Sequence, residues 1–339
     1  METVLLSSSD ADLIKAAELI KSGEIVGIPT ETVYGLAADA KNSDAVMKIF
    51  KAKGRPADNP LIVHIADISE LEQITHNIPD LAYKIAEKFW PGPLTIVLDK
   101  NDVIPDVTSG GLNTVGVRMP SNVIANKLIK LSGCQIAAPS ANKSGYPSPT
   151  SAEHVIKDMN GIIPAVVNGG DSLYGVESTV VSFDNDETVR ILRPGFITHC
   201  DLLEVTENVI IDDAILHDIS PDREAPSPGM KYKHYSPKAN VVLVEGTLEE
   251  YCRYVNKCAG NNTYALIYDC DVVNIDITCK YETYGSNSRE QAHNIFSKLR
   301  ALDEKGADNI IVRSPSTEGV GLAVYNRLLR SAGFEVISL

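Results

Sequence analysis

The chain has 339 residues, 44% of them hydrophobic, which is enough for a sizeable core and, by length, for two domains. Its formal net charge of −14 argues against a protein that coats nucleic acid through a broad basic surface, although a local basic pocket for a small polyanion is compatible with it. No apolar run approaches the roughly 18 residues of a membrane helix and no secretory signal pattern opens the chain, so we expect a cytoplasmic protein without membrane contact.

The cysteines and histidines indicate neither a disulfide framework nor a zinc site. No CxxC or HExxH pattern occurs, so a dedicated metal site would need distant residues, and we expect none in the protein itself. We expect reduced thiols at the six cysteine positions, 134, 200, 252, 258, 270 and 279.

The N-terminal part alternates helices with short apolar strands. Apolar spacing predicts a helix over residues 10–21, and the β-branched run from Ile25 to Ile28 predicts a buried strand that stops at Pro29. A hydroxyl-rich turn, Thr30 to Tyr34, follows it. Further helices are expected from residue 43 to the break at Gly54, at 79–89 and at 121–131, with strands at 61–65, 94–98, 114–118, 136–138, 165–168, 178–183 and 189–192. This pattern predicts one α/β domain over residues 1–210, built on a twisted mixed sheet.

A change of composition separates this domain from a smaller one. Residues 218–238 contain four prolines together with the basic and aromatic run from Lys231 to Tyr235, and we interpret 211–238 as a linker that folds over the first domain. Residues 239–339 alternate strands and helices, which predicts a Rossmann-like parallel α/β domain. Its expected strands are 240–244, 263–268 and 309–313, and its expected helices are 247–258, 288–305 and 320–331.

One glycine pattern in this second domain resembles a dinucleotide-binding motif only in part. Gly319 and Gly321 open the last helix, but Val324 occupies the third glycine or alanine position, and the pattern lies near the end of the chain. We interpret it as a tight helix entry.

Basic and polar side chains gather near the expected strand ends of the first domain. Arginine makes bidentate contacts with phosphates and carboxylates, and lysine adds a compact charge. Neither a Walker motif nor a GxSxG elbow is present, so an ordinary P-loop site is not expected and a serine hydrolase lacks its local signature. The residues themselves predict an anion-binding α/β pocket and no specific reaction.

Five ordered blocks resemble the signature of the YrdC-like family. They are Pro29–Leu36, Lys53-Gly54-Arg55, Asn59-Pro60-Leu61, Val117-Arg118 and Ser140-Ala141-Asn142. The linker segments Ser227–Met230 and His234–Pro237, together with the C-terminal α/β unit, resemble the longer two-domain branch, the threonylcarbamoyl-AMP synthases. The resemblance covers nearly the whole chain.

The resemblance implies a nucleotidyltransferase that converts L-threonine, bicarbonate and ATP to threonylcarbamoyl-adenylate and pyrophosphate. Mg²⁺ would accompany ATP, and no tightly bound organic cofactor is implied. The product would serve enzymes that modify the adenosine beside the tRNA anticodon, while contact between this chain and tRNA is left open. Positioning and charge neutralisation would dominate such a reaction.

The family also implies a role for individual residues. Positions that match threonine-contacting ones are Thr32, His64, Arg118, Ala138 and Ser178, with Thr32 expected to help select the amino acid. Positions that match nucleotide-contacting ones are Arg55, Asn59, Thr114, Ser140, Ser148, Arg193 and Tyr235. The catalytic set expected around the phosphates is Lys53, Arg55, Ser140 and Asn142. Tyr235 lies in the linker, which we expect to shield the reactive product from water.

Two alternatives remain at this point. The first domain could be an RNA-binding module of the YrdC type, which the acidic composition disfavours. It could also be a carbamoyl-transfer domain related to hydrogenase maturation factors, although these are expected to carry zinc-finger cysteine pairs that this chain lacks.

Overall fold

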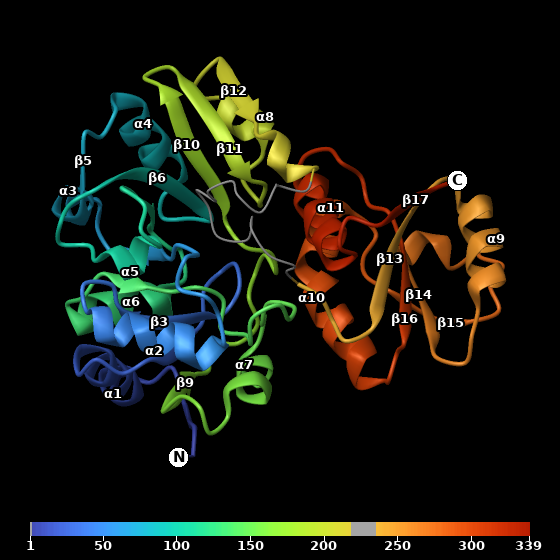
Figure 1. Cartoon of the computed structure of the whole chain (residues 1–339), viewed down its shortest axis with the longest axis horizontal. Helices are drawn as coiled ribbons and strands as arrows, with labels where there is room; N and C mark the ends of the chain where they lie inside the picture. Colours follow the sequence, from blue (N-terminus) through green and yellow to red (C-terminus); the bar gives the residue numbers. More distant parts are fainter. Residues whose placement is uncertain (1, 218–234) are drawn as a thin grey trace. The chain divides into compact units, whose positions relative to one another are not determined.

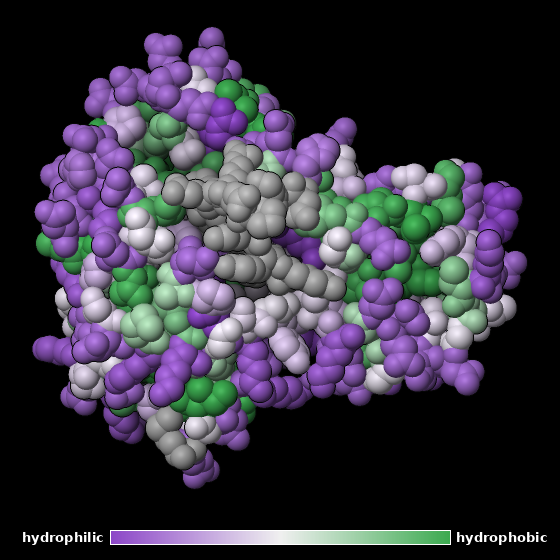
Figure 2. All heavy atoms as spheres, in the orientation of Figure 1, coloured by the Kyte–Doolittle hydropathy of each residue, from purple (hydrophilic) through white to green (hydrophobic). Residues whose placement is uncertain are grey.

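The computed structural model describes residues 2–217 and 235–339 of the chain (Figure 1). Among these residues the chain forms two compact units. Unit 1 holds residues 2–144 and 148–215, and unit 2 holds residues 145–147, 216–217 and 235–339. Hydrophilic side chains cover most of the face seen in Figure 2. No helix within the described part of the chain is long and apolar enough to cross a membrane.

Unit 1 is built on one mixed sheet, as the sequence predicted. The strands follow the order β1-β9-β2-β3-β8-β4-β7-β6-β10-β11-β12, and β5 pairs with β6. The sheet contains both parallel pairs, such as β4 with β7, and antiparallel pairs, such as β6 with β7. The strands are β1 (Val4–Leu6), β2 (Val26–Ile28), β3 (Gly35–Asp39), β4 (Ile62–His64), β5 (Thr75–His76), β6 (Leu94–Lys100), β7 (Thr114–Arg118), β8 (Ile136–Ala137), β9 (Ala165–Val167), β10 (Thr179–Asn185), β11 (Thr188–Arg193) and β12 (Asn208–Ile211).

Amphipathic helices cover this sheet. Ser9 and Asn122 cap α1 and α6 by accepting backbone N–H groups, and the apolar faces of these two helices join the core around Leu13, Val26 and Leu128. The helices of unit 1 are α1 (Asp10–Lys21), α2 (Ser43–Lys53), α3 (Leu71–Ile74), α4 (Asp80–Phe89), α5 (Asp106–Ser109), α6 (Val123–Ser132), α7 (Ala152–Met159) and α8 (His199–Leu203), with short 3₁₀ turns at Ile68–Glu70 and Asp213–Ile215.

Unit 2 has a five-stranded sheet in the order β15-β14-β16-β13-β17, and every pair in it is parallel, as predicted for a Rossmann-like domain. The strands are β13 (Asn240–Glu245), β14 (Thr263–Ile267), β15 (Lys280–Thr283), β16 (Asn309–Arg313) and β17 (Val336–Ser338). The helices are α9 (Leu248–Cys258), α10 (Ser288–Glu304) and α11 (Val320–Ser331), with a 3₁₀ turn at Asp269–Asp271.

Several elements differ from the sequence-based expectations. Strand β3 was not predicted, and it makes the turn after β2 a β-hairpin, because β2 and β3 pair antiparallel with Ile28 opposite Gly35. Strands β15 and β17 were not predicted either. Within the linker proposed for 211–238, Ile211 ends β12 and a 3₁₀ turn follows it. Residues 218–234 of that linker, and with them most of the expected cover over the first domain, lie outside the described residues.

Candidate functional site

The hairpin turn between β2 and β3 is held rigidly by its own threonine. The Thr30 hydroxyl donates to the carbonyl of Val33 (2.6 Å) and accepts the backbone N–H groups of Thr32 (3.2 Å) and Val33 (3.3 Å). Backbone hydrogen bonds from Tyr34 to Pro149 and from Leu36 to Pro139, both 2.8 Å, tie the turn to two later loops. The turn is therefore a fixed wall of unit 1.

Arg118, the last residue of β7, connects this strand to the turn after β2 and to the loop that contains Gly92. Its Nη1 donates to Thr32 Oγ1 (2.9 Å), its Nη2 to Glu31 Oε1 (2.6 Å) and its Nε to the carbonyl of Gly92 (3.2 Å). The side chains of Arg118 and Glu31 are each only 4% exposed. Thr32 Oγ1 lies 2.8 Å from Thr30 Oγ1, and because the Thr30 proton is used on Val33, the Thr32 hydroxyl donates to Thr30.

Glu31 is ionised despite its burial. Burial by itself raises the pKa of its carboxyl, but the Arg118 charge and the hydrogen bond from the Ser121 backbone outweigh burial and hold the pKa below its usual range. Ser121 N–H donates to Oε1 at 3.0 Å and Asn122 N–H to Oε2 at 3.3 Å. Asn122 is the N-cap of α6, so the carboxylate also faces the positive end of a helix.

His64 lies beside this pair as a neutral imidazole. It is the last residue of β4 and stands opposite Arg118 in the parallel register. Burial, and then the nearby Arg118 charge, lower its pKa to about 3. Its Nδ1 is buried and has no hydrogen-bond partner among the described residues. Such an atom costs free energy unless a ligand or water pairs with it.

Lys53 connects the basic loop to the loop at 140–142. Its Nζ donates to the carbonyls of Ser140 and Asn142, the latter at 2.7 Å, and its side chain is buried. Gly54 closes α2 in the left-handed conformation, with φ of 63°, and so directs the chain away from the helix just after Lys53. Arg55 Nη2 donates to the carbonyls of Asn59 and Pro60, both at 3.3 Å.

Asn59 and Thr114 lie toward the other end of the central strands. Both amide atoms of the Asn59 side chain are buried without a partner among the described residues. Thr114 begins β7 and Arg118 ends it, so alternation puts the two side chains on one face, about 13 Å apart at 3.3 Å per residue.

A second group of hydroxyls lies at the start of β10. Ser178 Oγ is 2.8 Å from Thr95 Oγ1, and Arg193 donates from Nε to the Ser178 carbonyl (3.0 Å) and from Nη2 to its hydroxyl (3.1 Å). Gly195 packs so closely here that a Cβ would lie 2.3 Å from the Thr179 nitrogen.

The remaining predicted residues have structural partners. Ser148 donates its hydroxyl to Glu177 Oε1, both side chains being buried. Ala138 donates its backbone N–H to Ile62 (3.0 Å), and Ser140 forms an isolated bridge with Gly35. Tyr235 belongs to unit 2, where its ring lies 5.2 Å from that of Phe296. Every other predicted site residue lies in unit 1.

Sequence reasoning gave no role to Glu31, Gly92 or Thr95. Glu31 was quoted within the turn motif, but its contacts with Ser121 and Asn122 come from 90 and 91 residues later in the chain. The signal available was an acidic residue directly after a buried strand, beside a residue expected to bind an amino acid.

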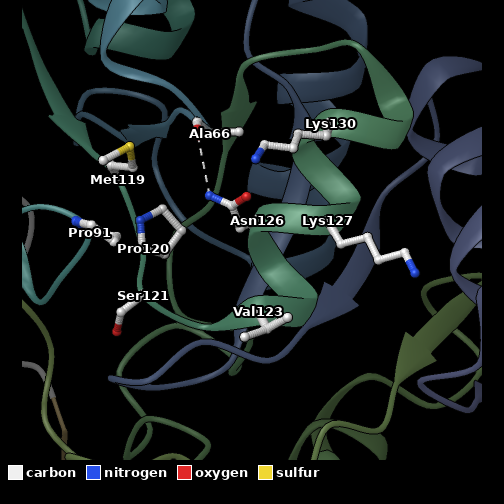
Figure 3. A pocket seen from close by; sticks show the side chains of 9 residues that line it. All are labelled: Ala66, Pro91, Met119, Pro120, Ser121, Val123, Asn126, Lys127 and Lys130. Carbon is white, nitrogen blue, oxygen red and sulfur yellow. Dashed lines mark hydrogen bonds between the residues drawn. The ribbon is translucent and has the colours of Figure 1, made fainter.

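A pocket of about 460 Å³ lies beside the segment that connects β7 to α6 (Figure 3). Met119 and Ser121 line it, together with Asn126, Lys127 and Lys130 of α6, and the Asn126 amide donates to the Ala66 carbonyl at 3.4 Å. None of the predicted site residues lines this pocket.

Comparison with known proteins agrees with this two-unit architecture. Residues 18–195 match the family model described as "Telomere recombination", and residues 197–333 match the model described as "Threonylcarbamoyl-AMP synthase, C-terminal domain". The chain is thus a YrdC-like α/β protein with an added C-terminal domain.

Full-length relatives narrow this class. The threonylcarbamoyl-AMP synthase of Pyrococcus abyssi is 44% identical over 96% of this chain and 95% of its own length, and that of Bacillus subtilis is 44% identical over 98% and 96%. The crystal structure of P. abyssi Sua5 complexed with L-threonine superposes with a TM-score of 0.93 at 41% identity, covering 99% of this chain and 100% of that one. The chain belongs to the threonylcarbamoyl-AMP synthase family.

Proposed function

We propose that the chain condenses L-threonine, bicarbonate and ATP to threonylcarbamoyl-adenylate and pyrophosphate, and so acts as an ATP-dependent nucleotidyltransferase. The observation that carries the proposal is Arg118, a buried guanidinium held by Glu31 and Thr32. It lies opposite His64, whose Nδ1 has no partner within residues 2–217 and 235–339. The L-threonine in the related P. abyssi structure supports an amino acid as the ligand of this site. The product would supply enzymes that modify tRNA.

The chemistry needs no nucleophilic side chain. The threonine amine attacks the bicarbonate carbon and water leaves, which gives a carbamate. A carbamate oxygen then attacks the α-phosphorus of ATP, and the bond to pyrophosphate breaks in line. Holding the two reactants in line and neutralising the phosphates would supply most of the acceleration.

Each part of the site has a role in this scheme. Arg118 would pair with the threonine carboxylate, because a planar guanidinium matches a carboxylate. Thr32 and His64 would bind the remaining polar groups of threonine, together with Ala138 and Ser178. The nucleotide would contact Asn59, Thr114, Ser148 and Arg193, and its phosphates would lie near Lys53, Arg55, Ser140 and Asn142.

In this scheme the magnesium ion is bound to ATP. Mg²⁺ binds phosphate oxygens while keeping several waters, and would arrive on the triphosphate of ATP. Among the described residues, no group of three or more His, Cys, Asp or Glu side chains is arranged to hold a metal ion.

Pyrophosphate release by the purified full-length chain tests the proposal. We expect release that requires ATP, L-threonine and bicarbonate together, with a product whose mass equals threonylcarbamoyl-adenylate. L-valine, which has the shape of threonine without its hydroxyl, should give at least tenfold less release, because a buried hydrogen-bonding site rejects an analogue that cannot pair with it. Release that does not depend on threonine would contradict the proposal, and RNA binding without turnover would favour an RNA-binding module.

A further inference from the structure

We propose that Glu31 is a positioning residue that fixes Arg118 for the substrate carboxylate, and thereby makes the site selective for amino acids with a free α-carboxylate. This inference rests on the proposed function.

The contacts of Glu31 fix it from two sides. Oε1 accepts hydrogen bonds from Arg118 Nη2 at 2.6 Å and from the Ser121 backbone at 3.0 Å, and Oε2 accepts one from the Asn122 backbone at 3.3 Å. The backbone groups belong to the entry of α6, which is anchored in the core of unit 1 by Ala125, Leu128 and Ile129. The Glu31 carboxylate therefore holds the Arg118 guanidinium in a fixed position relative to α6.

The contacts of Arg118 leave capacity for a ligand. A guanidinium has five N–H groups. Three described contacts, with Gly92, Thr32 and Glu31, use one N–H of Nε, Nη1 and Nη2 in turn. One N–H on each terminal nitrogen is left over, which is the number that a carboxylate accepts in a bidentate contact.

Charge explains why a carboxylate is needed at position 31. A buried arginine without a partner is costly, and an ionised Glu31 balances its charge while both side chains remain 4% exposed. Because Glu31 balances the charge of Arg118, the pair as a whole attracts a substrate carboxylate only weakly through net charge. Binding then depends on where the two remaining N–H groups of Arg118 point. Removing the charge of Glu31 releases the guanidinium from that placement.

Two variants separate positioning from folding. Glu31→Gln keeps the size of the side chain and removes its charge, whereas Glu31→Asp keeps the charge and withdraws it by one methylene. Glu204→Gln is the matched control, because it removes an equal charge from an exposed pair with Lys88 at 2.7 Å. The measured quantity is the ratio of kcat/KM for L-threonine to that for L-threoninamide, which has the same side chain without the carboxylate.

We expect Glu31→Gln to lower this ratio at least tenfold, mainly through the KM for L-threonine, and Glu31→Asp to lower it about threefold. The KM for ATP and the ratio in Glu204→Gln should stay within twofold of the wild type. If Glu31 had a purely structural role, its replacement would lower kcat/KM equally for L-threonine and for L-threoninamide. The ratio would then stay unchanged, and this result would overturn the inference. If Glu31→Gln fails to fold, an unchanged ratio in Glu31→Asp overturns it as well. A wild-type chain that releases no pyrophosphate with threonine would instead refute the proposed function, and the inference with it.

Discussion

Each unit of this chain contains an arginine–carboxylate pair at the end of a strand. In unit 1 Arg118 ends β7 and pairs with Glu31, and in unit 2 Arg313 ends β16 and pairs with Asp271. The pair in unit 1 is the more deeply buried, since Arg313 is 20% exposed and Arg118 only 4%. The two units thus hold the same chemical pair in comparable positions.

The surroundings of the two pairs differ. In unit 2 the Arg313 guanidinium lies 4.5 Å from the centre of the Tyr268 ring, Tyr268 donates its hydroxyl to Ser314, and Tyr284 donates to the Arg313 carbonyl at 2.9 Å. Of residues 235–339, none has a buried side-chain polar atom without a partner, whereas His64 and Asn59 of unit 1 do. An ion pair alone therefore does not indicate a ligand site. What distinguishes the pair in unit 1 is the neighbouring His64, whose Nδ1 has no hydrogen-bond partner in the part of the chain that the structure describes.

Replacement of Arg118 should have the largest effect. Arg118→Ala leaves Glu31 charged and buried, which costs about 3–5 kcal/mol of unfolding free energy. It should also lower kcat/KM for threonine roughly a thousandfold, because loss of one partner of a buried contact between charged groups weakens binding by about 2–5 kcal/mol. Urea unfolding and pyrophosphate release measure the two effects. The double variant Arg118→Ala/Glu31→Gln should regain stability without activity, and recovery of activity would contradict the assignment.

His64 should make the stability of unit 1 depend on pH. Its folded pKa of about 3 lies below the unfolded value of 6.5, so between these values the unfolded chain binds one proton more than the folded chain. Stability should therefore fall as the pH drops below 6.5, by up to about 1.4 kcal/mol per pH unit, or about 2 kcal/mol at pH 5. Urea unfolding at several pH values should give a smaller slope for His64→Gln. The exposed His76→Gln is the control, and an equal slope in all three proteins would refute a neutral His64.

The pair in unit 2 should affect stability alone. Asp271→Asn should lower the unfolding free energy by about 1–2 kcal/mol, because Arg313 keeps partial contact with water and with the Tyr268 ring. Thermal unfolding measures the loss. The KM for threonine should not change, and a large increase would mean that this pair also belongs to the substrate site.

The smallest effect is expected for a hydroxyl that is already satisfied. Tyr268→Phe removes the hydrogen bond to the Ser314 carbonyl and should cost about 1 kcal/mol of unfolding free energy. Activity should remain that of the wild type. Loss of activity would show that the hydrogen-bonded group around Arg313 in unit 2 contributes to catalysis as well as to stability.

Much of the fold could be predicted from the sequence, because its helices and central strands have strong periodicity. The stripe of Ala292, Ile295, Phe296 and Leu299 in α10 is an example. Strand β3 escaped prediction because Gly35-Leu36-Ala37-Ala38-Asp39 has no β-branched residue, and it is a strand only because β2 and β8 pair with it. Strand β15 lies at the edge of its sheet, half exposed, without an apolar pattern.

The site was predictable only in part. The family resemblance drew attention to Thr32 and Arg118, and the structure joins them by a hydrogen bond of 2.9 Å. It also brings Lys53 to the loop that contains Ser140 and Asn142. The role of Glu31 depends on a helix entry 90 residues away, which has no local signature in the sequence. The same holds for the burial of His64, whose Nδ1 finds no partner among the residues that the structure describes.

Toward a ligand, the hydroxyl of Thr32 can act only as a hydrogen-bond acceptor. Its proton is committed to Thr30 and one of its lone pairs to Arg118, so only one lone pair is left to face an incoming molecule. A ligand can meet it only by offering a hydrogen. O-methyl-threonine presents an oxygen without a proton, so its ether oxygen at this position would bring two lone pairs face to face. A ligand hydroxyl placed at this lone pair would have to donate its proton to Thr32, which an ether cannot do.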